Sequence, residues 1–165
     1  SLIYERYHAT QQILLTSNMN SIFSQIFLGS MVIPITILVQ IWFIKVSIKR
    51  LKAVNAKKSA TATSSSTLPV VLVLSLATLW LLAALSIAIW IWAGFFQLLG
   101  FFENLEESLY FSMVSFTTIG FGDLTLPQEW RILSGMIAAN GLVLFGLNTA
   151  FLIEVLHRSL VRESP

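Results

Sequence analysis

The stretch that decides the fold is TTIGFGD, residues 117–123. Two glycines, Gly120 and Gly122, alternate with the bulky Phe121, and the carboxylate of Asp123 closes the run. Glycine adopts backbone conformations that other residues avoid. Its alternation with a bulky residue therefore allows successive carbonyl groups to point the same way while the side chains point outward. Carbonyl oxygens that line one axis form a cage for a dehydrated cation. We interpret the rest of the chain as the means of positioning this stretch.

Three long runs without any charged residue surround it, at 22–44, 68–102 and 132–153. A helix crosses the bilayer core with about 20 apolar residues. The chain of 165 residues is 56% hydrophobic and only 11% charged, whereas a soluble domain carries roughly 25% charged residues. These runs predict an extra transmembrane helix at 22–44, an outer helix at 68–94 and an inner helix at 131–157.

A shorter uncharged segment, 108–116, lies directly before the glycine-rich stretch. It is too short to cross a bilayer, and a segment of this kind is tolerated at membrane depth only when it is buried in protein. We expect a re-entrant helix over 104–117 followed by a loop at 118–122. The predicted fold class is an all-α membrane protein with three transmembrane helices, a re-entrant helix and a loop.

The charges between the runs predict the orientation of the chain. Six basic residues follow the first run with no acid among them: Lys45, Lys49, Arg50, Lys52, Lys57 and Lys58. Short loops rich in Lys and Arg stay in the cytoplasm, so we place 45–67 and the tail 158–165 inside. The segment 103–129 carries five acids and no base, and we place it outside together with 1–21. We therefore expect a multi-pass protein of the plasma (cell inner) membrane with an external N-terminus.

The basic segment also contains candidates for contacts with anionic lipid headgroups, namely Lys45, Lys49, Arg50 and Lys52. Simple topological anchoring is the alternative. The Ser- and Thr-rich tract 59–67 is predicted to be a flexible linker. Within the spans, Gln25 and Gln40 are expected to face neighbouring helices or the membrane interface. Asn148 faces either a water-filled cavity or a neighbouring helix.

Several function classes are not supported by the residues present. The absence of cysteine removes thiolate chemistry and Cys-based metal sites. The basic residues form no nucleic-acid-binding motif. No span carries Arg or Lys at every third position, as a voltage sensor requires, and no nucleophile lies near a base. We expect neither an enzyme nor a nucleic-acid-binding protein.

Residues 108–124, SLYFSMVSFTTIGFGDL, resemble the pore helix and selectivity filter of potassium channels, whose filters are TVGYG loops. The resemblance continues through Trp130-Arg131 at the start of the inner helix and through 141–150, and it covers roughly 68–157. It implies a homotetramer, because one loop cannot enclose an ion. It also implies K⁺ ions, with no other cofactor, bound by the carbonyls of a filter composed of Thr118, Ile119, Gly120, Phe121 and Gly122.

The resemblance further implies a set of residues that support the filter: Thr117, Asp123, Tyr110, Phe111 and Val114. The chain departs from the family at several of these positions. Phe121 replaces the commoner Tyr, Tyr110 and Phe111 stand where two Trp often occur, and Val114 replaces a carboxylate found in some members. These departures remove polar support. We therefore expect a filter that conducts potassium and inactivates or loses selectivity more readily.

The inner helix carries a stripe of residues at helical spacing, Leu142, Phe145, Thr149 and Ile153. Such a stripe alone is typical of helix packing, whereas the resemblance implies that it lines the pore, with Ile153 as a hydrophobic gate. Gly141 is a candidate hinge, and Gly141 and Gly146 alternatively allow close helix packing. The predicted function is a tetrameric potassium-selective channel. A weakly selective cation channel and a non-conducting accessory subunit are the alternatives.

Overall fold

The computed structural model describes residues 2–60 and 70–160, which are helical except for the connections around a short central helix. The elements are α1 (Leu2–Ala60), α2 (Val70–Leu98), α3 (Leu105–Phe116), a 3₁₀ turn η1 (Gln128–Trp130) and α4 (Arg131–Leu160). Three segments are long and apolar enough to cross a membrane: Ser21–Arg50, Leu74–Leu98 and Gln128–His157. The predicted all-α class with three spanning helices is confirmed.

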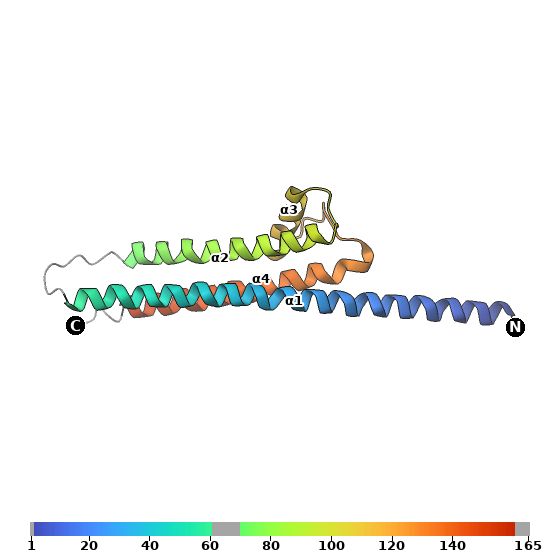
Figure 1. Cartoon of the computed structure of the whole chain (residues 1–165), viewed down its shortest axis with the longest axis horizontal. Helices are drawn as coiled ribbons and strands as arrows, with labels where there is room; N and C mark the ends of the chain where they lie inside the picture. Colours follow the sequence, from blue (N-terminus) through green and yellow to red (C-terminus); the bar gives the residue numbers. More distant parts are fainter. Residues whose placement is uncertain (1, 61–69, 161–165) are drawn as a thin grey trace.

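The helices form an up-and-down arrangement in which α1 and α4 run in the same direction and α2 runs in the opposite one (Figure 1). The contacts pair α1 with both α2 and α4. The short α3 follows the end of α2, folds back beside it, and also contacts α4. Three successive crossings of a membrane require this alternation of direction.

Helix α1 extends beyond the predicted span 22–44 at both ends. Neither 2–28 nor 45–60 contains glycine or proline, and the second of these segments is rich in Lys and Ala, which favour helices. The basic part of the predicted linker is therefore helical up to Ala60. The predicted flexible tract 59–67 lies mostly outside the described residues. Pro34 is inside α1, where membrane helices tolerate proline.

The other bounds differ from the predicted ones by a few residues. Helix α2 continues past Gly94 to Leu98 and ends where Gly100 has φ +70°. The amide of Gly100 donates to the Gln97 carbonyl (3.1 Å), and that of Phe101 donates to the Phe96 carbonyl (3.3 Å). This is a Schellman motif, in which a left-handed residue closes the helix. Gly100 therefore ends α2, and Gly94 does not.

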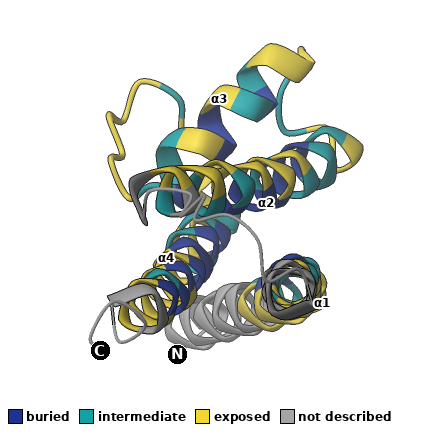
Figure 2. Cartoon of the chain, turned by 90° about the vertical axis from the view of Figure 1, so that its left-hand side faces the viewer, coloured by how far each residue is buried: buried dark blue, intermediate teal, exposed yellow. Residues whose placement is uncertain are grey.

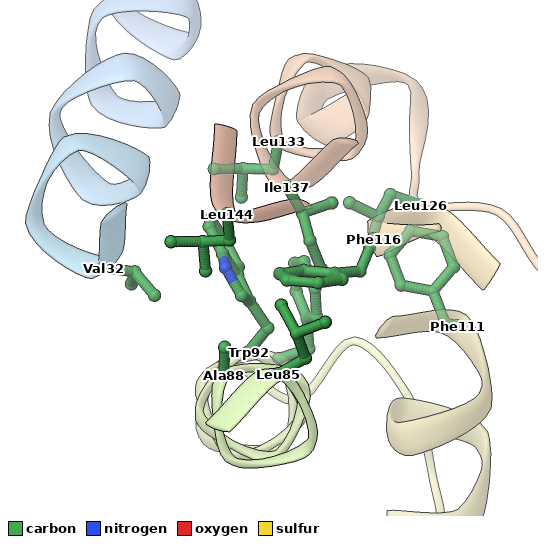
Figure 3. Packing of buried hydrophobic residues seen from close by; sticks show 11 residues of the cluster. Val32, Leu85, Ala88, Trp92, Phe111, Phe116, Leu126, Leu133, Ile137 and Leu144 are labelled. Carbon is green, nitrogen blue, oxygen red and sulfur yellow. The ribbon is translucent and has the colours of Figure 1, made fainter. Parts of the chain in front are cut away.

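The core lies between the helices and includes residues from all four of them (Figure 2). Figure 3 shows the Phe116 ring of α3 lying among Leu85 of α2, Ile137 of α4 and Leu126 of the following loop. Val32 brings α1 into the same cluster. Rings of α2 and α3 pack edge to face, with the centroids of Phe96 and Phe111 separated by 5.2 Å. Burial of these side chains fixes α3, and with it the start of the glycine-rich loop.

Candidate functional site

The glycine-rich loop has an alternating backbone. Thr118, Gly120 and Gly122 have φ angles of 63°, 56° and 80°, and the intervening Ile119 and Phe121 have negative φ. Alternating right- and left-handed conformations place successive N–H groups on one side of a chain, and the amides of Ile119 and Gly120 share one acceptor, the Val114 carbonyl. A Cβ at either glycine would meet open space. Glycine is required at these two positions by the backbone conformation, because L-residues are strained there.

The first three amides of the loop form hydrogen bonds with carbonyls in the last turn of α3. The amide of Thr118 donates to the Ser115 carbonyl (3.0 Å), and the amides of Ile119 (3.0 Å) and Gly120 (3.3 Å) both donate to the Val114 carbonyl. The first two bonds form a Schellman motif with Thr118 as its left-handed residue. In α2 the corresponding residue is Gly100. A β-branched residue with positive φ is uncommon and is strained by about 1–3 kcal/mol.

The loop carbonyls, in contrast, have no hydrogen-bond donor within the described part of the chain. No such bond ends on the carbonyls of Thr118, Ile119, Gly120 or Phe121. The loop is exposed in the single chain, including 58% of Ile119 and 68% of Phe121. Among the described residues, no three His, Cys, Asp or Glu side chains form a cluster that could hold a metal ion. The free carbonyls are therefore the candidate cation ligands of this region.

A side-chain bond connects α3 to the residue that follows the loop. The Tyr110 hydroxyl donates to Asp123 Oδ2 at 2.7 Å. This bond lowers the pKa of Asp123 below its ordinary value, helped by the Leu124 amide and opposed by desolvation. The same bond raises the pKa of Tyr110. The sequence argument counted Tyr110 among the changes that remove polar support from the loop. That inference was wrong, because Tyr110 supplies such a contact.

The other predicted support residues act through packing or through the main chain. Phe111 is buried, and its ring lies 5.1 Å from that of Phe102. Val114 contributes its carbonyl oxygen, which accepts two loop amides. The Thr117 hydroxyl donates to the Met113 carbonyl at 2.8 Å and closes the last turn of α3. All five predicted support residues therefore lie in α3 or next to the loop.

The predicted pore-lining stripe lies on one exposed face of α4. Leu142, Phe145, Thr149 and Ile153 are all exposed in the single chain. The Phe145 ring lies 5.8 Å from that of Phe116, so this residue contacts the end of α3. The Thr149 hydroxyl donates to the Phe145 carbonyl at 3.0 Å. Phe145 thus contacts α3, and the exposed stripe continues from there along α4 to Ile153.

Gly141 lies where α4 crosses the end of α3. A Cβ built on Gly141 would lie 2.0 Å from the Phe116 carbonyl oxygen, a separation that atoms do not adopt. A Cβ on Gly146 would meet nothing within 4 Å. Of the two roles considered for Gly141, close packing has a direct structural reason. The hinge role stays a prediction.

Buried polar residues connect α1 to α4, and sequence reasoning identified them only in part. Asn148 is buried and accepts a hydrogen bond from Gln40 Nε2, which settles the two alternatives in favour of a neighbouring helix. Gln25 Oε1 accepts from the Ile132 amide at 3.0 Å. Gln25 and Gln40 were expected to face neighbouring helices or the membrane interface, and both contact a neighbouring helix. Asn140, which bonds Thr36, was missed, although an amide side chain in an apolar run was the available signal.

Comparison with known proteins identifies one family. Residues 71–158, just over half of the chain, match the family model described as "Ion channel". None of the curated proteins and none of the solved structures matches the chain. The matched residues include α3, the glycine-rich loop and nearly all of α2 and α4.

Proposed function

Because the chain belongs to the ion channel family, we propose that four copies of it assemble into a potassium-selective channel. The channel is a passive conduit and not an enzyme. K⁺ ions bind to the carbonyls of Thr118, Ile119, Gly120 and Phe121, and Gly122 completes the filter. The observation that carries this proposal is a difference within the loop backbone. The amides of Thr118, Ile119 and Gly120 donate to carbonyls of α3, whereas the carbonyls of 118–121 have no donor in the described part of the chain.

Assembly around an axis is supported by the exposure of apolar residues in the single chain. Ile119 and Phe121 of the loop and Leu142 and Ile153 of α4 are all more than half exposed. A closed cyclic tetramer would cover the loop side chains and enclose the stripe on α4. Leu142, Phe145 and Thr149 then line the cavity, and Ile153 narrows it. Native mass measurement in detergent is expected to give four chains, and a monomer at all concentrations would contradict the proposal.

The membrane placement is part of the same proposal. The basic end of α1 lies in the cytoplasm of a cell with the channel in its plasma (inner) membrane, and α3 lies at the outer face. Arg50 lies over the Trp80 ring, 5.0 Å from its centroid, while Lys45 and Lys49 are exposed beside it. These cations and Lys52 would contact anionic lipid headgroups, at about 1 kcal/mol each.

Ion flux through purified protein in liposomes tests the function. Potassium-driven flux is expected, with much smaller flux when sodium replaces potassium and inhibition by a blocking cation. Equal flux of the two ions would favour the weakly selective cation channel, and no flux would favour the non-conducting accessory subunit. Either result would overturn potassium selectivity.

A matched pair of glycine variants tests the filter itself. Gly122→Ala places a Cβ at φ +80°, a strain of about 1–2 kcal/mol and hence roughly tenfold in population per subunit. Potassium flux is expected to fall by at least that factor. Gly94→Ala is the control, because Gly94 is helical and a Cβ there meets nothing within 4 Å. Similar flux in the two variants would contradict the assignment.

A further inference from the structure

The return segment, residues 124–132, joins the glycine-rich loop to the first turn of α4. Its first residues are irregular, and the short turn η1 follows, in which the Trp130 amide donates to the Pro127 carbonyl at 2.8 Å. Leu126 is buried in the core. The return segment begins two residues after Gly122, so its position limits where the glycine-rich loop can end.

Helix α1 contributes two polar side chains to the return segment. The first amides of any helix lack partners within that helix, and Gln25 Oε1 accepts from one of them, the Ile132 amide of α4, at 3.0 Å. The Ser21 hydroxyl donates to the Glu129 carbonyl at 2.8 Å. Gln25 is buried although it carries a polar amide. Two main-chain groups of the return segment are thus bonded to side chains of α1.

The two side chains also hold each other in place. Gln25 Nε2 donates to the Ser21 carbonyl at 3.2 Å and to Ser21 Oγ at 3.3 Å, which directs Gln25 Oε1 to the Ile132 amide. Rotation of the Gln25 amide by half a turn would set its NH₂ group against the Ile132 N–H and its oxygen against the Ser21 carbonyl. Only one orientation therefore satisfies both ends of the amide. The Ser21 hydroxyl accepts from Gln25 and gives its single proton to Glu129, so all four residues belong to one set of connected hydrogen bonds.

Close helix packing brings Gln25 within reach of α4. Gly29 lies one turn after Gln25, and a Cβ built on it would lie 2.5 Å from Met136 Sδ and 3.3 Å from a Leu133 methyl carbon. Small residues let membrane helices approach in this way. Leu133 is fully buried in the core cluster that also contains Phe116 of α3. The contact between α1 and the start of α4 is therefore part of the same core that fixes the end of α3.

We propose that Ser21 and Gln25 of α1 are positioning residues for the selectivity filter. They hold the return segment, and through it the end of the loop at Gly122, in the conformation that conducts potassium. When their bonds are lost, the return segment can adopt other positions, and the loop carbonyls lose their fixed spacing. The proposal rests on the proposed function, in which this loop binds K⁺. Helix α1 precedes the residues 71–158 that match the family model, so the proposal gives the additional span a role in ion selectivity.

Disruptive and conservative variants of the two residues test this role. Gln25→Leu removes the acceptor of the Ile132 amide, and Ser21→Ala removes the donor to the Glu129 carbonyl. Each is expected to lower the ratio of potassium to sodium permeability several-fold and to accelerate current decay several-fold. Reversal potentials and currents in mixed solutions measure both quantities. Ser21→Thr keeps a hydroxyl at the same position and is expected to restore both values. Wild-type values in Gln25→Leu and Ser21→Ala would overturn the proposal.

Two control variants separate this role from general support of the helix packing. Ser24→Ala removes a hydroxyl that donates to the Ser21 carbonyl within α1, and it is expected to behave as the wild type. Thr36→Val removes a buried hydrogen bond from Asn140 of α4, at 2.8 Å, outside the return segment. It is expected to lower the midpoint of thermal unfolding and to leave the permeability ratio unchanged. An equal fall of that ratio in Thr36→Val and Gln25→Leu would show that packing in general sets the selectivity, which contradicts the proposal.

Hydrogen exchange tests the contact without any ion flux. The Ile132 amide is bonded to Gln25, so it is expected to exchange slowly in the purified wild-type protein. In Gln25→Leu it is expected to exchange roughly tenfold faster, because its partner is lost, whereas Ser24→Ala leaves the rate unchanged. Equal rates in Gln25→Leu and the wild type would show that the bond is absent and would overturn the proposal. If the wild-type protein conducts no ions, the proposed function fails and the role in the filter fails with it, while the exchange rates still report whether α1 holds the return segment.

Discussion

At the scale of single residues, the hydrogen bond between Tyr110 and Asp123 joins α3 to the end of the proposed filter through two side chains. Tyr110→Phe keeps the ring and removes the donor of the 2.7 Å bond. We expect Tyr110→Phe channels to inactivate several-fold faster and to show a smaller ratio of potassium to sodium permeability. Reversal potentials and current decay in mixed solutions measure both quantities. Met113→Phe, at an exposed position on α3, is the control. Current decay in Tyr110→Phe that equals decay in the wild type would show that the bond does not support the filter.

The same bond gives a dependence on external pH with a definite sign. Because the bond lowers the pKa of Asp123 in the folded protein, its contribution is complete above the ordinary Asp pKa of about 3.9. The contribution is lost as the pH falls through the lowered value. Tyr110→Phe raises that value toward the ordinary one, so acid-induced loss of current is expected at a higher pH than in the wild type. Equal midpoints in an external pH titration would contradict this.

Gly141 and Gly146 form a matched pair on one helix. Gly141→Ala places a Cβ against the Phe116 carbonyl, whereas Gly146→Ala meets nothing within 4 Å. We expect Gly141→Ala to destabilise the protein by about 1–3 kcal/mol, as overpacking does. Gly146→Ala is expected to be neutral or slightly stabilising, because Ala favours helix. Thermal unfolding followed by tryptophan fluorescence distinguishes them, and equal midpoints would show that α4 moves away from α3 at no cost.

At the scale of elements, the charge-free runs were sufficient to predict the three membrane spans, because a bilayer requires both apolar residues and a minimum length. The ends of the helices were less predictable. The sequence alone does not distinguish Gly94 from Gly100 as the end of α2. In the structure α2 continues past Gly94 to Leu98, and Phe96 is buried in the core. The loop was predictable from its glycines. The Gly141–Phe116 contact was not, because it depends on how α3 and α4 meet, and the Tyr110–Asp123 bond depends on how the segment after α3 folds back on that helix.

Phe116 determines where α3 ends relative to α2 and α4. Its ring is fully buried in the cluster of Figure 3. Phe116→Ala is expected to cost about 3–5 kcal/mol of stability and to abolish potassium flux, because the loop amides are attached to the same turn of α3. Met113→Ala, half exposed on the same helix, is expected to change stability by less than about 0.5 kcal/mol. Chemical denaturation together with flux checks both variants, and a conducting Phe116→Ala protein would contradict the expectation.

At the scale of the whole molecule, the arrangement of the helices fixes which segments share a side of the membrane. The end of α1, the start of α2 and the end of α4 lie together, and the start of α4 lies at the other end (Figure 1). Lys49→Cys and Asn104→Cys are expressed separately in intact cells and treated with a thiol reagent that does not cross the membrane. Only Asn104→Cys is expected to be labelled. Both positions are exposed in the chain. Labelling of Lys49→Cys alone would invert the proposed orientation while leaving the fold unchanged.

The carbonyl oxygen of Val114, which receives the amides of Ile119 and Gly120, has a consequence for how such sequences diverge. Every amino acid carries the same main-chain oxygen, so no replacement that keeps this turn helical removes it. The side chain at position 114 can therefore change without removing the acceptor of these two amides. The attachment of the loop is thus set by a backbone conformation that its two glycines permit, and not by the identity of that side chain.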